Sequence, residues 1–269
     1  MPMKCINNVN IFYDEIGQGE AIIFHHGYTG AHDVWLDEIA PRLKHKYRCI
    51  VMDCRGAGDS EQPAEGYNIE QYARDVIGLA DELGCQKFTY VGHSMGGGIG
   101  YQLGVEHAHR LEKLVLVAPI PAAGTRGTEA MLQAGIAQRK TVNVRAEMIN
   151  QRLKLRLRAS EASVALSVDR ALSVSDGHFR DSWYSMRDFN VVDKLPELQT
   201  QTLIVAGAAD GLCTANVNDW QNLPNATLHV FSRVGHGVPR DVPDEFSIVL
   251  DDFMEHGVIN AKTQQAKLQ

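Results

Sequence analysis

Short apolar runs alternate with longer amphipathic segments along most of this 269-residue chain, and this alternation constrains the fold more than any other feature. Apolar runs of this length predict buried strands, and such strands alternating with helices predict parallel βαβ units. The predicted strands cover residues 21–24, 47–52, 87–91, 114–117, 203–206 and 227–231. The predicted helices cover residues 34–43, 69–83, 95–106, 217–223 and 244–253. We therefore expect an α/β fold with a mostly parallel central sheet flanked by helices.

One long segment departs from this alternation. Residues 121–189 contain many helix formers and no strong strand run, which predicts a helical insertion between core segments 1–120 and 190–269. An insertion at this place is expected to lie as a cap over the C-terminal ends of the strands, where open α/β sheets bind ligands. The polar tail after Gly257 is expected to be frayed.

Apolar and basic side chains of the insertion are candidates for contact with a substrate. Phe179, Trp183 and Met186 are expected either to face a substrate pocket or only to hold the cap against the core. The first half of the insertion is basic, which predicts a solvated helix face or a surface that attracts an acidic substrate. Its cationic residues are Arg139, Lys140, Arg145, Arg152, Lys154, Arg156 and Arg158.

Charge argues against some classes of partner, and cysteine usage bears on the compartment. The formal net charge is −7, so nucleic acids and anionic membranes are expected to be repelled. The five cysteines are odd in number and scattered, which favours reduced thiols. The N-terminus has no apolar stretch of secretory type, and no run approaches the length of a membrane span. These features favour a cytoplasmic protein whose partner is a small molecule, and they leave the oligomeric state open.

The segment Gly92-His93-Ser94-Met95-Gly96-Gly97 is the most informative for chemistry. It fits the Gly-x-Ser-x-Gly pattern, and it lies between a predicted strand and a predicted helix. A serine at such a sharp turn adopts a strained backbone, and the flanking glycines leave room for the turn. The helix that follows directs its N-terminal N–H groups toward any negative charge that forms beside the serine. Ser94 is therefore the candidate nucleophile, and we assign no chemical role to His93.

Three segments together resemble the α/β-hydrolase superfamily. These are the turn around Ser94, the segment His25-His26-Gly27-Tyr28, which is similar to the oxyanion loop of that superfamily, and residues 53–60, which are similar to the loop after its next strand. The resemblance covers nearly the whole chain except the insertion. It implies the α/β-hydrolase fold with a helical cap and the activity of a serine hydrolase. No phosphate-binding loop, metal-ligand cluster or flavin motif stands out in the sequence, so we expect no cofactor and no metal.

The resemblance also implies where the partners of the serine lie, since in this superfamily the acid and then the histidine follow it along the chain. Asp210 follows the strand at 203–206, and His236 follows the strand at 227–231. His236 is the candidate general base, and Asp210 is the candidate acid that orients it. Asp176 and Asp193 are weaker candidates for the acid, and His178 is a further histidine that could reach the site.

An acyl-transfer intermediate carries a negative oxygen that needs preorganised donors. We expect the backbone N–H groups of Tyr28 and Met95 to supply them. His25 and His26 are expected only to pack and to form hydrogen bonds beneath this loop. A second group of charged side chains, made of Asp53, Arg55 and Asp59, is expected to tie a tight loop together near the pocket.

The leading functional prediction is hydrolysis of small carboxylic esters through an acyl-serine intermediate. The same residues could instead cleave an enol-lactone, a carbon–carbon bond or a thioester, and the sequence does not separate these reactions. A ligand-binding protein without turnover is the alternative from another class. The complete set of serine, histidine and aspartate argues against it, because a binding protein needs no such set.

Overall fold

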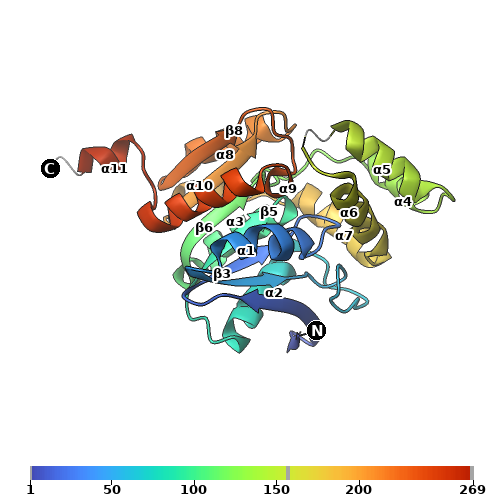
Figure 1. The fold of residues 1–269 in the computed structure, drawn as a ribbon, viewed down its shortest axis with the longest axis horizontal. Helices are drawn as coiled ribbons and strands as arrows, with labels where there is room; N and C mark the ends of the chain where they lie inside the picture. Colours follow the sequence, from blue (N-terminus) through green and yellow to red (C-terminus); the bar gives the residue numbers. More distant parts are fainter. Residues whose placement is uncertain (1, 156–157, 267–269) are drawn as a thin grey trace.

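The central sheet of the described chain has eight strands, which lie in the order β1-β2-β4-β3-β5-β6-β7-β8. The computed structural model describes residues 2–155 and 158–266 (Figure 1). Both pairs that involve β2 are antiparallel, and every pair from β4 to β8 is parallel. The strands are β1 (Met3–Ile6), β2 (Val9–Ile16), β3 (Glu20–His25), β4 (Tyr47–Met52), β5 (Phe88–His93), β6 (Leu111–Val117), β7 (Thr202–Gly207) and β8 (Ala226–Phe231).

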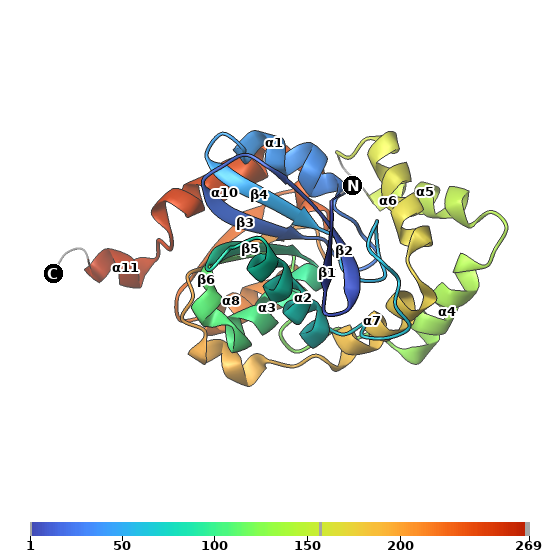
Figure 2. The ribbon, with the colours of Figure 1, turned by 90° about the horizontal axis from the view of Figure 1, so that it is seen from below.

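Helices cover both faces of this sheet, and a further group of helices, formed by residues 129–188, stands to one side of it (Figures 1 and 2). The α-helices are α1 (Ala40–Leu43), α2 (Ile69–Glu82), α3 (Met95–Glu106), α4 (Glu129–Arg139), α5 (Val144–Leu155), α6 (Glu161–Ser173), α7 (Asp176–Asp188), α8 (Cys213–Asn222), α9 (Val238–Asp241), α10 (Pro243–His256) and α11 (Ala261–Ala266). A π-helix η1 (Trp35–Ile39) and two 3-10 helices, η2 (Ala108–Arg110) and η3 (Val192–Glu197), complete the elements.

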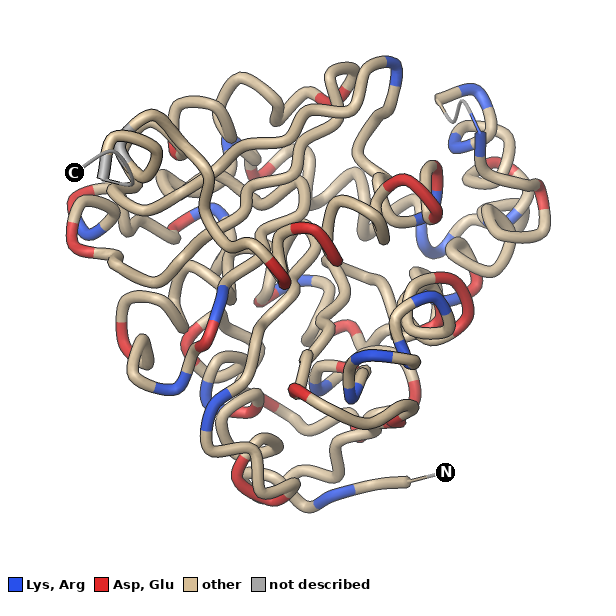
Figure 3. Tube along the Cα trace, turned by 60° about the vertical axis from the view of Figure 1, so that its left-hand side comes forward, with Lys and Arg blue, Asp and Glu red and all other residues tan. Residues whose placement is uncertain are grey.

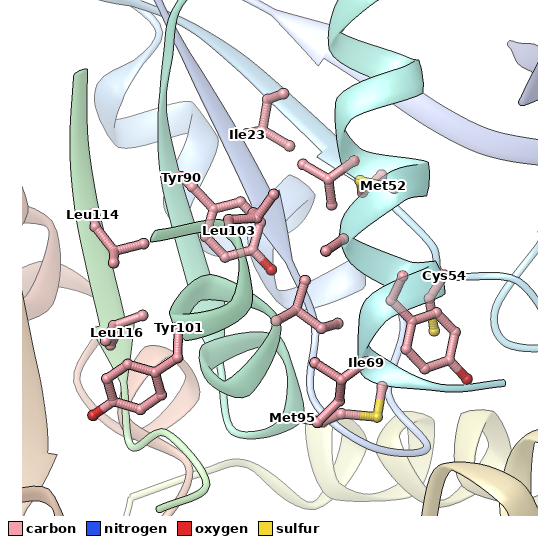
Figure 4. Packing of buried hydrophobic residues seen from close by; sticks show 14 of the residues in the cluster. Ile23, Met52, Cys54, Ile69, Tyr90, Met95, Tyr101, Leu103, Leu114 and Leu116 are labelled. Atoms are coloured by element: carbon pink, nitrogen blue, oxygen red, sulfur yellow. The ribbon is translucent and has the colours of Figure 1, made fainter. Parts of the chain in front are cut away.

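Alternation within each strand explains how one sheet supports two cores. In β3, Ile22 and Phe24 face one hydrophobic cluster with η1, α1 and α10, whereas Ile23 faces the other cluster with α2 and α3. Successive side chains of a strand point to opposite faces, so an unbroken apolar run serves both layers. Figure 4 shows the cluster that contains Ile23, in which Tyr90 and Leu114 of the sheet pack beside Leu103 of α3. The predicted α/β class with a mostly parallel sheet is confirmed.

All six predicted strands are present as β3 to β8, but the sequence reading missed the N-terminal hairpin of β1 and β2. The hairpin turns at Asn7 and Asn8, both of which have positive φ, 47° and 64°. Asparagine tolerates this left-handed conformation better than most residues, and it is frequent in two-residue hairpin turns. The Asn-Asn pair was the signal available in the sequence.

Two predicted segments differ in detail from the structure. The helix predicted at 34–43 is divided into η1 and α1, and the Ala40 N–H bonds to the carbonyl of Trp35, five residues back. Pro41 has no N–H to continue the regular ladder, which accounts for the change at this point. The tail after Gly257, which was predicted to be frayed, contains α11. Just before this helix, the Asn260 side chain accepts a hydrogen bond from the Thr263 N–H at 3.0 Å.

The segment between β6 and β7 holds α4 to α7, which together we call the cap. In Figures 1 and 2 these helices stand to one side of the sheet, and α6 and α7 are nearer to it than α4. The described residues of this segment form helices and turns and no strand, as predicted for the insertion. Within the described chain, no helix is both long and apolar enough to cross a membrane.

Helix α10 provides a matched test of the core facing β3. Phe246 is fully buried against Trp35, with ring centroids 6.2 Å apart, whereas Ile248 on the same helix is 70% exposed. Phe246→Ala is expected to lower the free energy of unfolding by about 3–5 kcal/mol, because it removes a large side chain from a packed core. Ile248→Ala is expected to change it by about 0.5 kcal/mol or less. Urea unfolding measures both, and equal losses would contradict this account of the core.

Candidate active site

Ser94 lies on a strained turn between β5 and α3. Its φ is 56° and its ψ is −114°, a region that non-glycine residues enter at a cost of about 1–3 kcal/mol. The surrounding main chain holds the turn, since the Ser94 N–H donates to the Val117 carbonyl and its carbonyl accepts from Ile120. A Cβ on Gly96 would lie 2.7 Å from the His26 carbonyl oxygen, so only glycine allows this approach.

Two loops at the C-terminal ends of β7 and β8 bring the predicted partners to Ser94. The His236 Nε2 atom lies 2.9 Å from the Ser94 Oγ, and its Nδ1 atom lies 2.8 Å from the Asp210 Oδ2. His236 is 142 residues from Ser94 in the sequence. The sheet joins them because the carboxyl ends of its parallel strands meet at one edge. The three predicted catalytic residues are therefore in one hydrogen-bonded chain.

The surroundings of His236 define its orientation. An ionised carboxylate at Asp210 accepts from Nδ1–H, which leaves Nε2 as the acceptor for the Ser94 hydroxyl. Burial would raise the pKa of the Asp210 carboxyl, but the interactions with His236, together with the hydrogen bond from the Leu212 N–H and the nearby His93, lower it on balance. His93 donates from Nε2 to the His236 carbonyl at 2.8 Å, and so it helps to hold the loop of His236. The arrangement can take a proton from the Ser94 hydroxyl as that oxygen attacks.

The loop after β3 packs directly against the turn of Ser94. A Cβ on Gly27 would lie 2.9 Å from the Ser94 Cβ, and Tyr28 lines the same cavity as Ser94. His25 and His26 lie beneath this loop and donate from Nδ1 to the carbonyls of His26 and Gly27. Burial lowers the pKa of His25 to about 3 and also lowers that of His26, so both rings are neutral. Their predicted packing role agrees with these contacts.

The loop that carries Asp53 is tied by charged hydrogen bonds, as predicted. Asp53 accepts from the His32 N–H, the His32 ring and the Asp59 N–H at 2.7–2.8 Å. Arg55 forms a buried bidentate pair with Asp75 at 2.6 and 2.7 Å. Ligand atoms of His32, Asp53 and Asp59 lie within 4.8 Å of one another, a spacing that a metal ion could use. Both Asp53 oxygens already accept hydrogen bonds, and the Asp59 carboxylate pairs with Arg170 of the cap, so this group is better explained as a structural tie.

A cavity of about 290 Å³ opens beside Ser94 and His236. Its described lining includes none of the three predicted pocket residues, so the prediction of Phe179, Trp183 and Met186 as lining residues is corrected. Phe179 and Trp183 pack instead on the ring of Tyr28, with centroids 5.6 and 6.4 Å away, and Met186 is buried in the core. Helix α7 turns its apolar face toward this aromatic contact, which explains why these side chains hold the cap against the core.

The weaker candidates lie outside the hydrogen-bonded chain. His178 is fully buried, and its Nδ1 atom contacts the Tyr72 hydroxyl at 2.9 Å instead of reaching Ser94. The Asp176 side chain is 98% exposed. Sequence reasoning missed a different group, the cavity-lining residues of α5, α6 and α9. The sequence analysis named Arg152 only as part of the basic half of the insertion. No local pattern around Arg170 or Arg240 predicts that these residues line a pocket.

Comparison with known proteins shows the family. The model of the alpha/beta hydrolase fold matches residues 20–239, so the chain belongs to this family.

Three similar proteins illustrate its range of activities. A 2-hydroxy-6-oxononadienedioate/2-hydroxy-6-oxononatrienedioate hydrolase from Comamonas testosteroni is 28% identical over 94% of both chains. A non-heme chloroperoxidase from Streptomyces lividans is 36% identical over 118 residues, 43% of each chain. The structure of an esterase from Exiguobacterium antarcticum has a TM-score of 0.84 at 25% identity, and the match covers 94% of this chain and 98% of the esterase.

The contact between Asp210 and His236 predicts a pH-dependent contribution to stability. The folded-state pKa of Asp210 lies below its ordinary value of 3.8, so its stabilisation is fully present above that pH and is lost as the pH falls through the lowered pKa. Asp210→Asn is expected to be less stable than the wild type at pH 6, and this difference is expected to shrink as the pH falls below about 4. Urea unfolding across this range tests it. Asp176→Asn is the control, because the exposed Asp176 carboxylate contributes little to the free energy of unfolding.

Proposed function

We propose that this protein is a serine hydrolase that cleaves carboxylic esters of small molecules through an acyl-serine intermediate. The observation that carries the proposal is the chain of contacts from the Ser94 Oγ to His236 at 2.9 Å and from His236 to Asp210 at 2.8 Å. Such a chain activates a hydroxyl that is otherwise a poor nucleophile. A cavity of about 290 Å³ at this point suits a small substrate.

In the proposed mechanism the Ser94 oxygen attacks the ester carbonyl carbon while His236 accepts the hydroxyl proton. The backbone N–H groups of Tyr28 and Met95 stabilise the oxyanion. Met95 begins α3, whose N-terminal partial positive charge favours a negative oxygen there. The tetrahedral intermediate collapses, the alcohol leaves with the proton from His236, and the acyl group stays on Ser94. A water molecule then repeats the attack with His236 again as base, and the acid product is released.

A second candidate keeps these residues and changes the bond that is broken. The similarity to the Comamonas testosteroni hydrolase extends over 94% of each chain, and that protein's name denotes cleavage of a different kind of substrate. An enol-lactone, a carbon–carbon bond beside a carbonyl group, or a thioester would need the same nucleophile and base. The ester is the first proposal, and a solved esterase structure that superposes over 94% of this chain at 25% identity supports it.

Hydrolysis of 4-nitrophenyl acetate tests the nucleophile. Ser94→Ala is expected to lower kcat by about 10³-fold or more, and His236→Ala by a similar factor, because members of such a set act as one unit. Ser232→Ala, which alters an exposed serine outside the set, is expected to leave kcat unchanged. A fluorophosphonate probe should label Ser94 in the wild type.

Two outcomes would refute the proposal in distinct ways. Undiminished hydrolysis by Ser94→Ala, or labelling of another residue, would remove Ser94 as the nucleophile. Absence of ester hydrolysis in a wild type that the probe labels at Ser94 would keep the nucleophile and reject the ester. An enol-lactone, a vinylogous 1,5-diketone and an acyl thioester would then be compared as substrates of that labelled protein.

A further inference from the structure

The side chain of Tyr28 joins the loop after β3 to the cap. Its hydroxyl donates a hydrogen bond to the carbonyl of Phe179 on α7, 151 residues away in the sequence. The rings of His178, Phe179 and Trp183 contact the Tyr28 ring, with centroids 5.8, 5.6 and 6.4 Å from it. The backbone N–H of the same residue is the proposed oxyanion donor. Tyr28 therefore has its main chain beside Ser94 and its side chain against the cap.

The loop after β3 turns tightly at Tyr28. The Gly30 N–H donates to the Gly27 carbonyl at 2.9 Å, Thr29 has a positive φ of 56°, and His26 donates from Nδ1 to the same carbonyl at 2.8 Å. The Gly27 carbonyl and the Tyr28 N–H belong to one peptide unit, and in a planar trans peptide they point in opposite directions. The bonds to the carbonyl thus set the direction of the N–H, while the Tyr28 side chain holds the other end of that unit.

The α7 side of this contact is also held by the core. The hydroxyl of Tyr72, on α2, lies 2.9 Å from the His178 Nδ1 atom and 2.6 Å from the Ser182 Oγ. Burial lowers the pKa of His178 to about 3 and raises the pKa of Tyr28 above its ordinary value. Both rings are therefore neutral near pH 7, and the Tyr28 hydroxyl keeps the proton that it donates.

A second attachment of the cap is ionic and differs in kind. Arg170 of α6 donates to Asp33 at 2.9 Å and to Asp59 at 2.8 Å. Figure 3 shows acidic and basic positions interspersed along the trace, so charged groups are available for such attachments over much of the chain. Salt screens ion pairs near the surface, whereas it has little effect on packed rings and on a hydrogen bond between neutral groups. The contact at Tyr28 should therefore persist at high salt.

We propose that Tyr28 is a positioning residue whose side chain, through its contact with α7, holds its own backbone N–H in the place where it stabilises the oxyanion. The inference rests on the proposed hydrolytic function, and it gives the cap a part in the chemical step. A donor of this kind acts on the transition state more than on the bound substrate. Loosening the contact should therefore lower kcat with little change in KM.

Removal of one hydroxyl tests this link in the full-length protein. Tyr28→Phe keeps the ring but cannot donate to the Phe179 carbonyl, and it is expected to lower kcat for 4-nitrophenyl acetate by about fivefold, with KM changed by less than about twofold. The same loss is expected at about 1 M NaCl. Tyr184→Phe is the matched control, because it removes an exposed α7 hydroxyl that bonds to Glu129 within the cap at 3.0 Å. It should leave kcat and KM unchanged.

A sulfur-substituted substrate separates positioning from a merely structural role. In 4-nitrophenyl thionoacetate a C=S group replaces the C=O group, so the developing charge lies on sulfur, which accepts hydrogen bonds weakly. The ratio of kcat/KM for the oxygen ester to that for the thionoester reports the oxyanion donors, and Tyr28→Phe is expected to lower it by about threefold or more. A variant that contains less folded protein would lose both rates equally and keep the ratio.

Phe179→Leu tests the same link from the cap, and it keeps the inference testable if Tyr28→Phe fails to fold. It removes a ring that packs on Tyr28 and is expected to lower the ratio in the same direction. Labelling of Ser94 by a fluorophosphonate should also slow in both variants, because the phosphoryl oxygen becomes negative at the same donors while fluoride leaves. This rate tests the link even for a wild type that cleaves another kind of bond.

The outcomes distinguish this inference from the proposed function. An unchanged kcat and labelling rate in Tyr28→Phe, or a lower kcat with an unchanged oxygen-to-sulfur ratio, would overturn the inference and leave the hydrolase intact. Failure of the wild type to hydrolyse any ester, together with absence of labelling at Ser94, would instead refute the proposed function.

Discussion

The strained backbone of Ser94 is the constraint on which the rest of the site depends. Positive φ at a serine is unfavourable by itself, and it persists because β5, α3 and the loop after β3 meet there with almost no side-chain volume between them. A methyl group on Gly96 would meet the His26 carbonyl, and one on Gly27 would meet Ser94. This close approach places the hydroxyl, the start of α3 and the Tyr28 loop around one point.

The cap is attached to this core by contacts of two kinds. Around Tyr28 the attachment is aromatic, because Phe179, Trp183 and the ring of His178 pack on it. On the other side of the cavity it is ionic and polar, since Arg170 binds core carboxylates and Arg240 of the core binds the α6 backbone. The apolar contact holds α7 against the Tyr28 loop, and the arginines on the polar side line the cavity.

The sequence predicted the strands from β3 to β8 from their apolar runs, and it predicted the three members of the hydrogen-bonded chain from the turn at Ser94 and from the order of partners that the resemblance to α/β-hydrolases implies. Each candidate directly follows or shortly follows an apolar run, and parallel strands bring such positions to one edge. The hairpin of β1 and β2 was missed, since its mixed polar strands depend on pairing at the sheet edge. Phe179, Trp183 and Met186 were candidates both for the pocket and for holding the cap on the core, because their apolar character does not reveal which neighbour they contact.

The sequence by itself determined the fold class and the turn at Ser94, because these follow from local periodicity and glycine placement, and its resemblance to α/β-hydrolases implied the order of the acid and the histidine. Only the tertiary structure decided which cap residues line the cavity. Arg152, Arg170 and Arg240 lie on separate helices, and their positions depend on contacts with Asp33, Ser163 and Ser167, which are distant in the chain. A helix of known sequence still has several faces, and packing against the rest of the molecule selects the one that turns toward the substrate.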